Sequence, residues 1–260
     1  MDKNAFMEKY AITDEMLDRL SISWDDLMDI YEDYDKKIHE YEVVTSNIAV
    51  ALNKEKSIHS IKYRIKDKEH LIEKIIRKSV ADPSFVITTG NYMKLVKDLI
   101  GLRALHLFKE NWVDIHRFLA DNWEFYTTPR ANYKKGDPHE LLDMYSDFGC
   151  VLNEHRHGYR SVHYHLLIRQ GNREMVAEVQ VRTLFEEAWS EIDHYFRYSA
   201  KSDAEQAEPY LGLLNNITSN ADALASYINR MDTLIKAAES GLKEKARLNV
   251  KDMYKKVRNG

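Results

Sequence analysis

The sequence is poor in the residues that cross-link or interrupt a chain. Its 260 residues include a single cysteine, Cys150, four prolines and nine glycines. One cysteine excludes a disulfide within the chain and a zinc site built on several thiolates. Few prolines and glycines favour long helices joined by few loops. We therefore expect no disulfide framework, and a reducing, cytoplasmic location agrees with this composition.

The sequence also lacks long apolar runs and a strong net charge. No segment approaches the roughly 20 apolar residues of a membrane-spanning helix. The charged start, MDKNAFMEKY, lacks the apolar core of a signal peptide. We expect neither a membrane contact nor secretion. A net charge of −4 argues against a basic protein that coats nucleic acid, while 44% hydrophobic residues suffice for a buried core.

Hydrophobic spacing predicts helices at both ends of the chain and a mixed middle. Helical periodicity runs through residues 13–56, and two long helices are expected from Ala204 to about Arg258. The expected strands are 58–65, 102–108, 124–127, 161–169 and 174–182, and the expected inner helices are 67–79, 92–99, 112–119 and 183–198. This order predicts the α+β class, with a mixed β-sheet of about five strands flanked by helices.

One polar stretch, 130–157, interrupts this pattern. It contains Gly136, Pro138 and Gly149 and shows no clear hydrophobic period. Pro129 is expected to close the strand before it. The stretch predicts a long loop, and long loops in compact domains are often functional.

A row of cations is the first of four polar clusters that suggest chemistry. Arg64 and Lys66 lie two apart on an extended segment and so face the same way, and Lys74 follows in the next helix. Three cations placed in this way would suit a polyphosphate. The commoner meaning of such a row is a solvated basic face, so the row alone does not decide.

The second cluster is KDLIGLRAL, with Asp98 at the expected end of a helix and Arg103 on the next strand. A carboxylate at a strand edge is a common Mg²⁺ ligand, because Mg²⁺ prefers oxygen. Pairing of Asp98 with Lys94 or Lys97 is the alternative. By itself, this cluster is a weak indication of a metal site.

The third cluster is HRHGYRSVHYH, residues 155–165. Gly158 lets the backbone turn before a strand on which Tyr159, Ser161 and His163 share one face. Tyrosine offers a flat surface for a nucleobase, and the other two offer donors to phosphate. An ordinary amphipathic strand has the same pattern. Zinc is disfavoured because no carboxylate lies at ligand spacing beside the histidines.

The fourth cluster is AEVQVRT, in which Glu178, Gln180 and Arg182 share one face of a strand opposite two valines. The two strands on either side of residues 170–173 predict a hairpin, which sets this row beside the strand of Tyr159. A charged row on an otherwise apolar strand is costly unless it lines a site. A solvent-facing sheet surface is the alternative.

Taken in this order, the four clusters resemble the RelA/SpoT synthetase family, which makes the alarmones ppGpp and pppGpp. The resemblance covers roughly residues 40–200. It rests on R-x-K…K at Arg64, Lys66 and Lys74, DLIGLR from Asp98 to Arg103, GYRSVH from Gly158 to His163, and EVQVRT from Glu178 to Thr183. It implies a nucleotidyltransferase-like synthetase core at 58–200, an N-terminal helical region at 1–57 and C-terminal helices at 201–260. The family's hydrolase pattern is absent, so a small stand-alone synthetase is expected.

The resemblance also implies a reaction and its residues. The β,γ-pyrophosphate of ATP would pass to the 3′-hydroxyl of GTP or GDP, and AMP would leave. Asp98 and Glu178 would hold Mg²⁺, and Glu178 is also a candidate to accept the proton of the hydroxyl. We favour the metal role, since a metal-bound carboxylate is a poor base. The implied ATP contacts are Arg64 and Arg103 on the adenine, and Lys66 and Lys74 on the phosphates.

The acceptor nucleotide would bind at the third and fourth clusters. Tyr159 would stack on its base and His163 would contact phosphate, and Glu187 is hypothesised to select guanine by accepting from N1–H and the 2-amino group. The family usually has a lysine and a proline just before Gly-Tyr, where this sequence has His155 and Arg156. Arg156 would supply the positive charge of the missing lysine. The residues expected to support the site are Ser161, Gln180 and Arg182.

Two other functions remain open on the same residues. A toxin-type relative would place pyrophosphate on adenine nucleotides or the tRNA 3′ end. A tRNA acceptor would need a further basic surface, such as Lys134 with Lys135 or Arg77 with Lys78. A catalytically silent nucleotide-binding regulator is disfavoured, because such a protein would be free to lose its metal ligands.

The C-terminal helices carry apolar residues that need a partner. Examples are Leu211, Leu213, Leu214, Ile217 and Leu224. Stand-alone relatives use such helices to assemble, so a homo-oligomer is expected. Packing back onto the same chain is the alternative.

Overall fold

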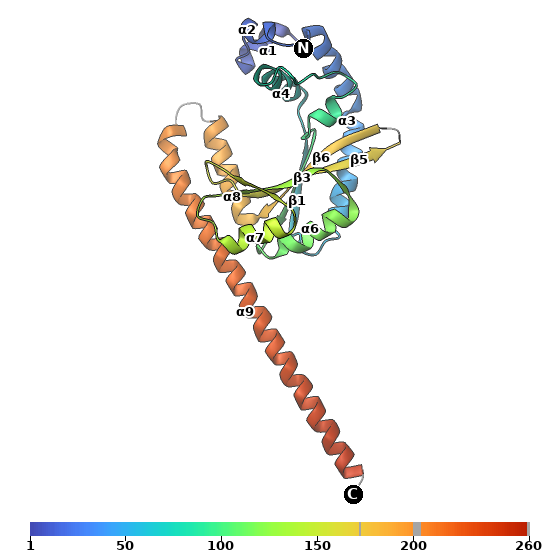
Figure 1. The fold of residues 1–260 in the computed structure, drawn as a ribbon, viewed down its shortest axis with the longest axis vertical. Helices are drawn as coiled ribbons and strands as arrows, with labels where there is room; N and C mark the ends of the chain where they lie inside the picture. The colour runs from blue at the N-terminus through green and yellow to red at the C-terminus, as the bar shows by residue number, and fades with distance from the viewer. Residues whose placement is uncertain (172, 200–203, 259–260) are drawn as a thin grey trace.

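Strands from six parts of the chain form one mixed sheet (Figure 1). The computed structural model describes the backbone of residues 1–171, 173–199 and 204–258, and their side chains except at 198–205 and 241–258. The strands are β1 (Ser60–Ile65), β2 (Ile100–His106), β3 (Glu124–Tyr133), β4 (Val151–Glu154), β5 (Ser161–Gln170) and β6 (Arg173–Thr183). Their order is β1-β2-β6-β5-β3-β4. The predicted α+β class is confirmed, with six strands in place of about five.

Two parallel pairs make the sheet mixed. β2 runs parallel to β6, and β3 runs parallel to β4, whereas the other neighbours are antiparallel. The hairpin of β5 and β6 is present as predicted, with Gly171 at positive φ in its turn. Because β2 and β6 are neighbours, the second and fourth clusters lie side by side at the centre of the sheet.

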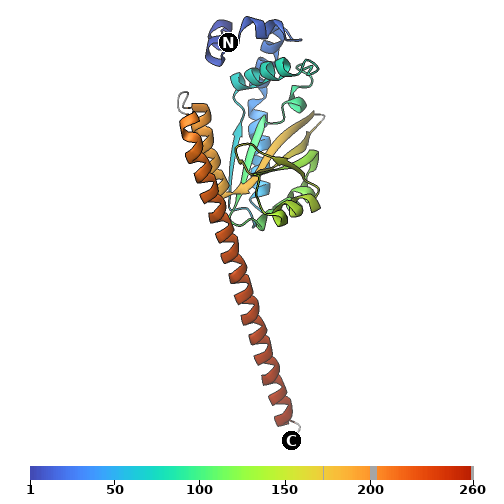
Figure 2. The ribbon, with the colours of Figure 1, turned by 60° about the vertical axis from the view of Figure 1, so that its left-hand side comes forward.

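Helices pack on both faces of the sheet and at one end of it (Figures 1 and 2). They are α1 (Lys3–Tyr10), α2 (Asp14–Asp18), α3 (Trp24–Leu52), α4 (Lys68–Ala81), α5 (Tyr92–Leu95), α6 (Asn111–Asn122), α7 (His139–Asp147), α8 (Leu184–His194), the π-helix η1 (Tyr195–Ser199) and α9 (Ala204–Arg258). α8 and the first part of α9 lie side by side, while the rest of α9 extends beyond the sheet (Figure 2). Among the described residues, no helix is long and apolar enough to cross a membrane.

The two faces of the sheet differ in polarity because side chains alternate along a strand. One face carries buried apolar residues such as Leu102 and Val179, which share a core with α3 and α6. The opposite face carries the polar rows of β2 and β6. α8 lies against that polar face, where Glu187 reaches Arg103 and Arg182. The functional site therefore lies on the face away from the main core.

Local sequence signals explain where the long helices begin. Ser23 and Asp26 form a capping box at the start of α3, and Thr183 with Glu186 forms another at the start of α8. Asp67 accepts two backbone amides at the start of α4, directly after β1. The cap of α4 turns the chain between Lys66 and Lys74, which places both lysines beside the same carboxylate.

Four expectations about individual elements are wrong. β3 continues to Tyr133 through Pro129, because register shifts between Phe125 and Arg130 absorb the proline. The stretch 130–157 is not one loop, since it includes the end of β3, all of α7 and β4. α5 ends at Leu95, after which Val96 leaves the helix and a turn at 97–98 leads into β2. A single helix, α9, replaces the two expected C-terminal helices.

Candidate functional site

A cavity of about 300 Å³ opens on the polar face between β1, β2, β6 and α8. Strand register sets its walls. Arg64 on β1 pairs with Gly101 on β2, and Gly101 pairs with Glu178 on β6. The polar lining residues are Lys62, Arg64, Asp98, Arg103, Glu178, Gln180 and Glu191. The first, second and fourth clusters thus meet at one cavity, although they lie far apart in the chain.

A second cavity, of about 880 Å³, lies next to the first and shares Arg64 with it. Its basic wall comes from β1 and one side of α4, through Lys66, Lys74, Arg77 and Lys78. Burial and the nearby charge of Lys74 lower the pKa of Lys78. Closely placed cations repel one another unless an anion binds between them, so this cavity suits a polyphosphate.

Asp98 lies in the turn before β2, where the two lysines converge on it. Its Oδ2 is 3.1 Å from Lys66 Nζ and 2.7 Å from Lys74 Nζ. Burial by itself would raise the pKa of Asp98, but the two ammonium groups hold it below its usual value. Its Oδ1 is buried and has no hydrogen-bond partner among the described residues. A buried carboxylate oxygen without a partner is costly, which makes this oxygen a candidate ligand atom.

Glu178 is held by three neighbours on the polar face of the sheet. Its Oε1 is 3.2 Å from His163 Nδ1 and 3.9 Å from His165 Nε2, and its Oε2 accepts from Gln180 at 2.9 Å. Burial alone would raise the pKa of Glu178, but the bonds from His163 and Gln180 keep it lowered. A carboxylate that stays ionised is a good ligand and a weak base. The geometry therefore favours the ligand role over proton acceptance.

Asp98 and Glu178 fit a divalent metal better than a zinc cluster. Among the described residues, no group of three His, Cys, Asp or Glu side chains comes together as a metal site. Mg²⁺ is commonly held by one or two carboxylates, with substrate phosphates and water completing its shell. The free Oδ1 of Asp98 and the ionised Glu178 match that ligand set.

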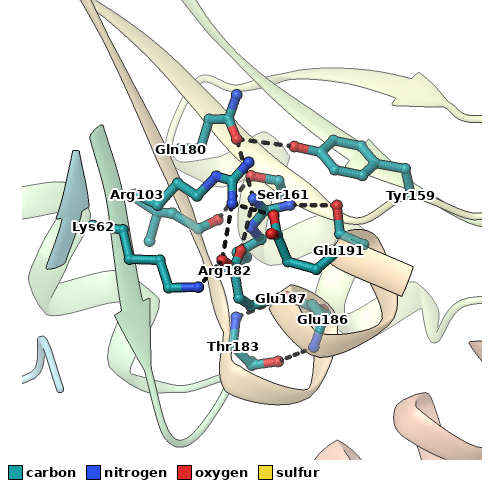
Figure 3. Close-up of polar contacts among 12 residues, drawn as sticks. Lys62, Arg103, Tyr159, Ser161, Gln180, Arg182, Thr183, Glu186, Glu187 and Glu191 are labelled. Atoms are coloured by element: carbon teal, nitrogen blue, oxygen red, sulfur yellow. Dashed lines mark hydrogen bonds and ion pairs between the residues drawn. The ribbon is translucent and has the colours of Figure 1, made fainter. Parts of the chain in front are cut away.

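Arg103 is fixed by carboxylates from α8 (Figure 3). Its NH1 donates to Glu187 Oε1 at 3.0 Å and also to Glu191 Oε1. Lys62 Nζ lies 3.1 Å from the same oxygen of Glu187. These contacts hold the guanidinium of Arg103 at the cavity wall, opposite the strand of Arg64.

Glu187 itself is buried behind that wall. Besides Arg103 and Lys62, it faces Arg182, whose NH2 is 2.7 Å from its Oε2. This last contact is an ion pair without hydrogen-bond geometry, since Oε2 lacks a hydrogen-bond partner. Only 6% of the Glu187 side chain is exposed, and Glu191 takes its place in the cavity lining. Its predicted contact with guanine would require the Arg103 pair to open, so that role stays a prediction.

Tyr159 and its neighbours form the other end of the site. The Tyr159 hydroxyl lies 2.9 Å from His163 Nε2 and donates to Gln180 Oε1 at 3.3 Å. The guanidinium of Arg182 lies 5.5 Å from the ring centre, which is cation–π distance. Gln180 thus links Tyr159 to Glu178.

Some predicted contacts are not found at the site. The Ser161 hydroxyl is buried and donates to the carbonyl of Val181, so it faces the neighbouring strand and not a phosphate. The side chain of Arg156 is exposed and makes no polar contact within the described part of the chain. Both ring nitrogens of His163 are engaged, one with Glu178 and one with Tyr159.

Sequence reasoning missed several residues of this site. Lys62, His165 and Glu191 each lie two or four positions from a residue that was named, on the same face of its strand or helix, so periodicity was a usable signal. Asp137 and Asn215, which hold the segment around Tyr159, gave no such signal. Their role depends on contacts between distant segments.

Comparison with known proteins identifies relatives of this fold. The sequence model described as "Region found in RelA / SpoT proteins" matches residues 63–203, more than half of the chain. The small alarmone synthetase 1 from Bacillus subtilis is similar in structure, with a TM-score of 0.59, 20% identity and coverage of 77% of this chain and 97% of that one. A GTP pyrophosphokinase family protein from Streptococcus pneumoniae has a TM-score of 0.58 and 18% identity, covering 78% and 95%. No match was found among curated protein sequences.

Proposed function

The chain belongs to the RelA/SpoT family, and on this premise we propose that it is an alarmone synthetase. It transfers the β,γ-pyrophosphate of ATP to the 3′-hydroxyl of GTP or GDP and releases AMP. The single observation that carries this proposal is the convergence on Asp98. Two lysines neutralise one of its oxygens, and the other oxygen is buried and unpaired. Such a site suits a polyphosphate beside the lysines and a metal at the unpaired oxygen.

ATP occupies the two adjoining cavities in this proposal. The adenine lies in the smaller cavity between the guanidinium groups of Arg64 and Arg103, whose flat faces suit a base. The phosphates extend into the larger basic cavity toward Lys66 and Lys74. Arg64 lines both cavities and so marks the point where ribose joins phosphate. In solved structures, the small alarmone synthetase 1 from B. subtilis binds AMPCPP and its product pppGpp, which supports two nucleotide sites in this fold.

Asp98 and Glu178 hold the metal, and we propose Mg²⁺. When bound, it offsets the negative charge that develops on the transferred phosphates. The residues of the chain supply orientation. Gln180 and His163 fix the two oxygens of Glu178, while Lys66 and Lys74 fix Asp98. Both lysines also line the basic cavity, so bound ATP phosphates would share the two ammonium groups with Asp98.

The acceptor nucleotide binds at Tyr159. Its base stacks on the ring, which Arg182 supports from the other side, and its 3′-hydroxyl points toward Glu178. The role of Arg156 as an added cation for acceptor phosphates remains part of this proposal, because the exposed side chain is free to turn toward the site. Glu187 as a guanine-selecting residue is also part of it.

A transfer assay tests the proposal directly. The protein is incubated with γ-labelled ATP and Mg²⁺, and with GDP, GTP, ADP or deacylated tRNA in separate reactions. We expect label on GDP and GTP. Label on ADP or tRNA alone would support a toxin-type activity, and no transfer despite intact ATP binding would support a silent regulator. Asp98→Asn and Glu178→Gln should each lower transfer at least 1,000-fold, roughly 4 kcal/mol of barrier.

A matched control separates site effects from folding effects. Glu174 lies on β6 four residues before Glu178, but it pairs with Lys94 and Arg169 away from the cavities. Glu174→Gln should therefore keep transfer within about twofold, because surface ion pairs contribute little. If Glu174→Gln and Glu178→Gln lost activity equally, the assignment of Glu178 to the site would be wrong.

We also propose that the chain forms a homo-oligomer through α9. A strip of exposed apolar side chains follows one side of this helix: Tyr210, Leu213, Ile217, Leu224, Tyr227, Met231 and Leu234. Their spacing alternates between three and four residues, with Asn220 at the one gap, as in a helix that packs on another helix. A second copy of this chain has the same strip and complements it.

Light scattering with size-exclusion chromatography tests the oligomer. Leu224→Glu places a charge in the middle of the strip and should reduce the mass to that of one chain. Ala223→Glu adds the same charge on an exposed neighbour outside the strip and should leave the mass unchanged. A wild-type mass of 30.6 kDa at micromolar concentration would contradict the proposal.

A further inference from the structure

The side of α9 that faces the rest of the chain carries buried polar residues. Leu211, Asn215, Asp222 and Ser226 are all buried, at 1–5% exposure, and their spacing puts them on one side of the helix. Buried polar groups are costly unless they are bonded, so such a row indicates specific contacts. Each of the three polar residues, Asn215, Asp222 and Ser226, makes at least one hydrogen bond to another part of the chain. Asp222 accepts from Thr183 at the start of α8, and Ser226 accepts from the amide of Lys109.

Asn215 contacts the segment that carries Tyr159. Its Nδ2 donates to the carbonyl oxygen of Gly158 at 2.9 Å, and its Oδ1 accepts from Arg160 NH1 at 2.9 Å. The two bonded groups lie immediately before and after Tyr159. Only 1% of Asn215 is exposed, so water cannot replace these bonds. One side chain from α9 therefore holds both sides of the residue that stacks on the acceptor base.

Asn215 approaches the backbone at Gly158 closely. Gly158 has a φ of +78°, which favours glycine, and a Cβ added there would lie 3.0 Å from Asn215 Oδ1 and 2.8 Å from Lys134 Cδ. Arg160 is held a second time, because its Nε and Nη2 donate to the two oxygens of Asp137 at 2.8 and 2.7 Å. The segment 158–160 is thus fixed from both sides, by Asp137 and by Asn215.

We propose that Asn215 is a positioning residue for the acceptor nucleotide. It acts through the backbone at Gly158 and the side chain of Arg160, which together set the direction of the Tyr159 ring. This inference rests on the proposed function, in which Tyr159 binds the acceptor. Asn215 touches neither the ATP cavities nor Asp98, so its loss should weaken acceptor binding and leave ATP binding unchanged.

Calorimetry on the full chain tests this split. GDP is the acceptor probe, and α,β-methylene-ATP is the donor probe. Asn215→Ala should raise the Kd for GDP about tenfold, which corresponds to about 1.4 kcal/mol. The Kd for α,β-methylene-ATP should stay within twofold. Asn215→Asp keeps an acceptor for Arg160 but sets a carboxylate oxygen against the carbonyl oxygen of Gly158, which repels it, so it should also raise the Kd for GDP.

The matched control is Asn229→Ala. Asn229 lies two heptads further along on the same side of α9, and its side chain makes no hydrogen bond among the described residues. This variant should keep both Kd values. An unchanged Kd for GDP in Asn215→Ala, or an equal loss of both ligands, would overturn the proposal.

Hydrogen–deuterium exchange separates this inference from the proposed function. Without any nucleotide, Asn215→Ala should speed exchange of the amides at 157–160 while most of α9 stays protected. Exchange that rises along all of α9 would show a general structural role and would overturn the positioning role. If the wild type bound no GDP, the proposed function would fail. Exchange at 157–160 would then decide alone whether Asn215 holds the segment, and unchanged exchange would refute it.

Discussion

Arg103 at the cavity wall is held from behind by Glu187, with Arg103 NH1 3.0 Å from Glu187 Oε1. The same carboxylate also faces Lys62 and the fully buried Arg182. Burial alone would raise the pKa of Glu187, but these three cations lower it, so the carboxylate stays charged. One buried anion thus supports a residue that lines the smaller cavity and a residue that packs on the ring of Tyr159.

Glu187→Gln should therefore affect both nucleotides and the fold. Removing the charge leaves Arg182 buried without its anion, which we expect to lower stability by roughly 3 kcal/mol. Arg103 loses one of its two carboxylate partners, so the KM for ATP should rise several-fold. Thermal unfolding and initial rates measure these effects, with Glu174→Gln as control, because Glu174 pairs with Lys94 and Arg169 away from the cavities.

The same variant also tests guanine selection. If Glu187 reads the acceptor base, Glu187→Gln should reduce the preference for GDP over ADP. If the preference stays unchanged while the KM for ATP rises, Glu187 acts only through Arg103. The ratio of kcat/KM for the two acceptors is the measurement that decides.

Lys74→Met should impair ATP binding more than it lowers the stability of the fold. Lys74 lies 2.7 Å from Asp98 and lines the basic cavity, so its loss removes a phosphate contact. We expect the KM for ATP to rise at least tenfold. Lys68→Met is the control, because Lys68 lies on the same helix but pairs with Asp35. Equal effects of the two substitutions would contradict a phosphate role for Lys74.

The ring of Tyr159 should matter more than its hydroxyl. Tyr159→Ala removes the stacking surface, worth about 1–3 kcal/mol per base, so the KM for the acceptor should rise about 5- to 150-fold. Tyr159→Phe keeps the ring and loses the contacts with His163 and Gln180, and it should change this KM less than fivefold. A larger effect of Tyr159→Phe would indicate that the hydroxyl, and not stacking, carries the role.

The packing of α9 should depend on pH through Asp222. Burial raises the pKa of Asp222 to about 7, with a further rise from Glu186 and opposing effects from Lys109 and Arg160. The folded chain then binds more protons than the unfolded chain between about pH 4 and 7. Stability from this group is therefore full below that window and is lost as pH rises through it.

Asp222→Asn tests that pH dependence. The amide keeps an acceptor for Thr183 and never ionises, so the variant should unfold at a higher temperature than the wild type at pH 8 and show a flatter profile between pH 5 and 8. Thermal unfolding at several pH values checks this. An identical profile for the two proteins would show that Asp222 is not the titrating group.

The polar rows of the site could be predicted from the sequence because they depend on local geometry. Alternation along a strand places Glu178, Gln180 and Arg182 together whatever the rest of the chain does. The order of the four motifs was sufficient to name the family, and the matched segment 63–203 confirms it. Helix starts were likewise readable from caps such as Thr183.

Other elements could not be predicted because packing overrides local preference. Pro129 does not end β3, since the strand accommodates it with register shifts against β5. Tyr92 to Leu99 has helical spacing, but the helix ends at Leu95, and a turn flanked by the buried Val96 and Leu99 leads into β2. In each case, burial against a distant segment outweighs a weak local signal.

Sequence alone determined which side chains share a face, and hence that Asp98, Glu178 and the basic row of β1 and α4 were available for a nucleotide and a metal. Tertiary structure alone decided what each of them touches. It placed Glu187 behind Arg103 and directed Ser161 to a neighbouring carbonyl. It also brought Asn215 into hydrogen-bond contact with Gly158, although the two residues are 57 positions apart in the chain. The physical reason is that alternation is a property of one segment, whereas a buried hydrogen bond between distant segments exists only once both are packed.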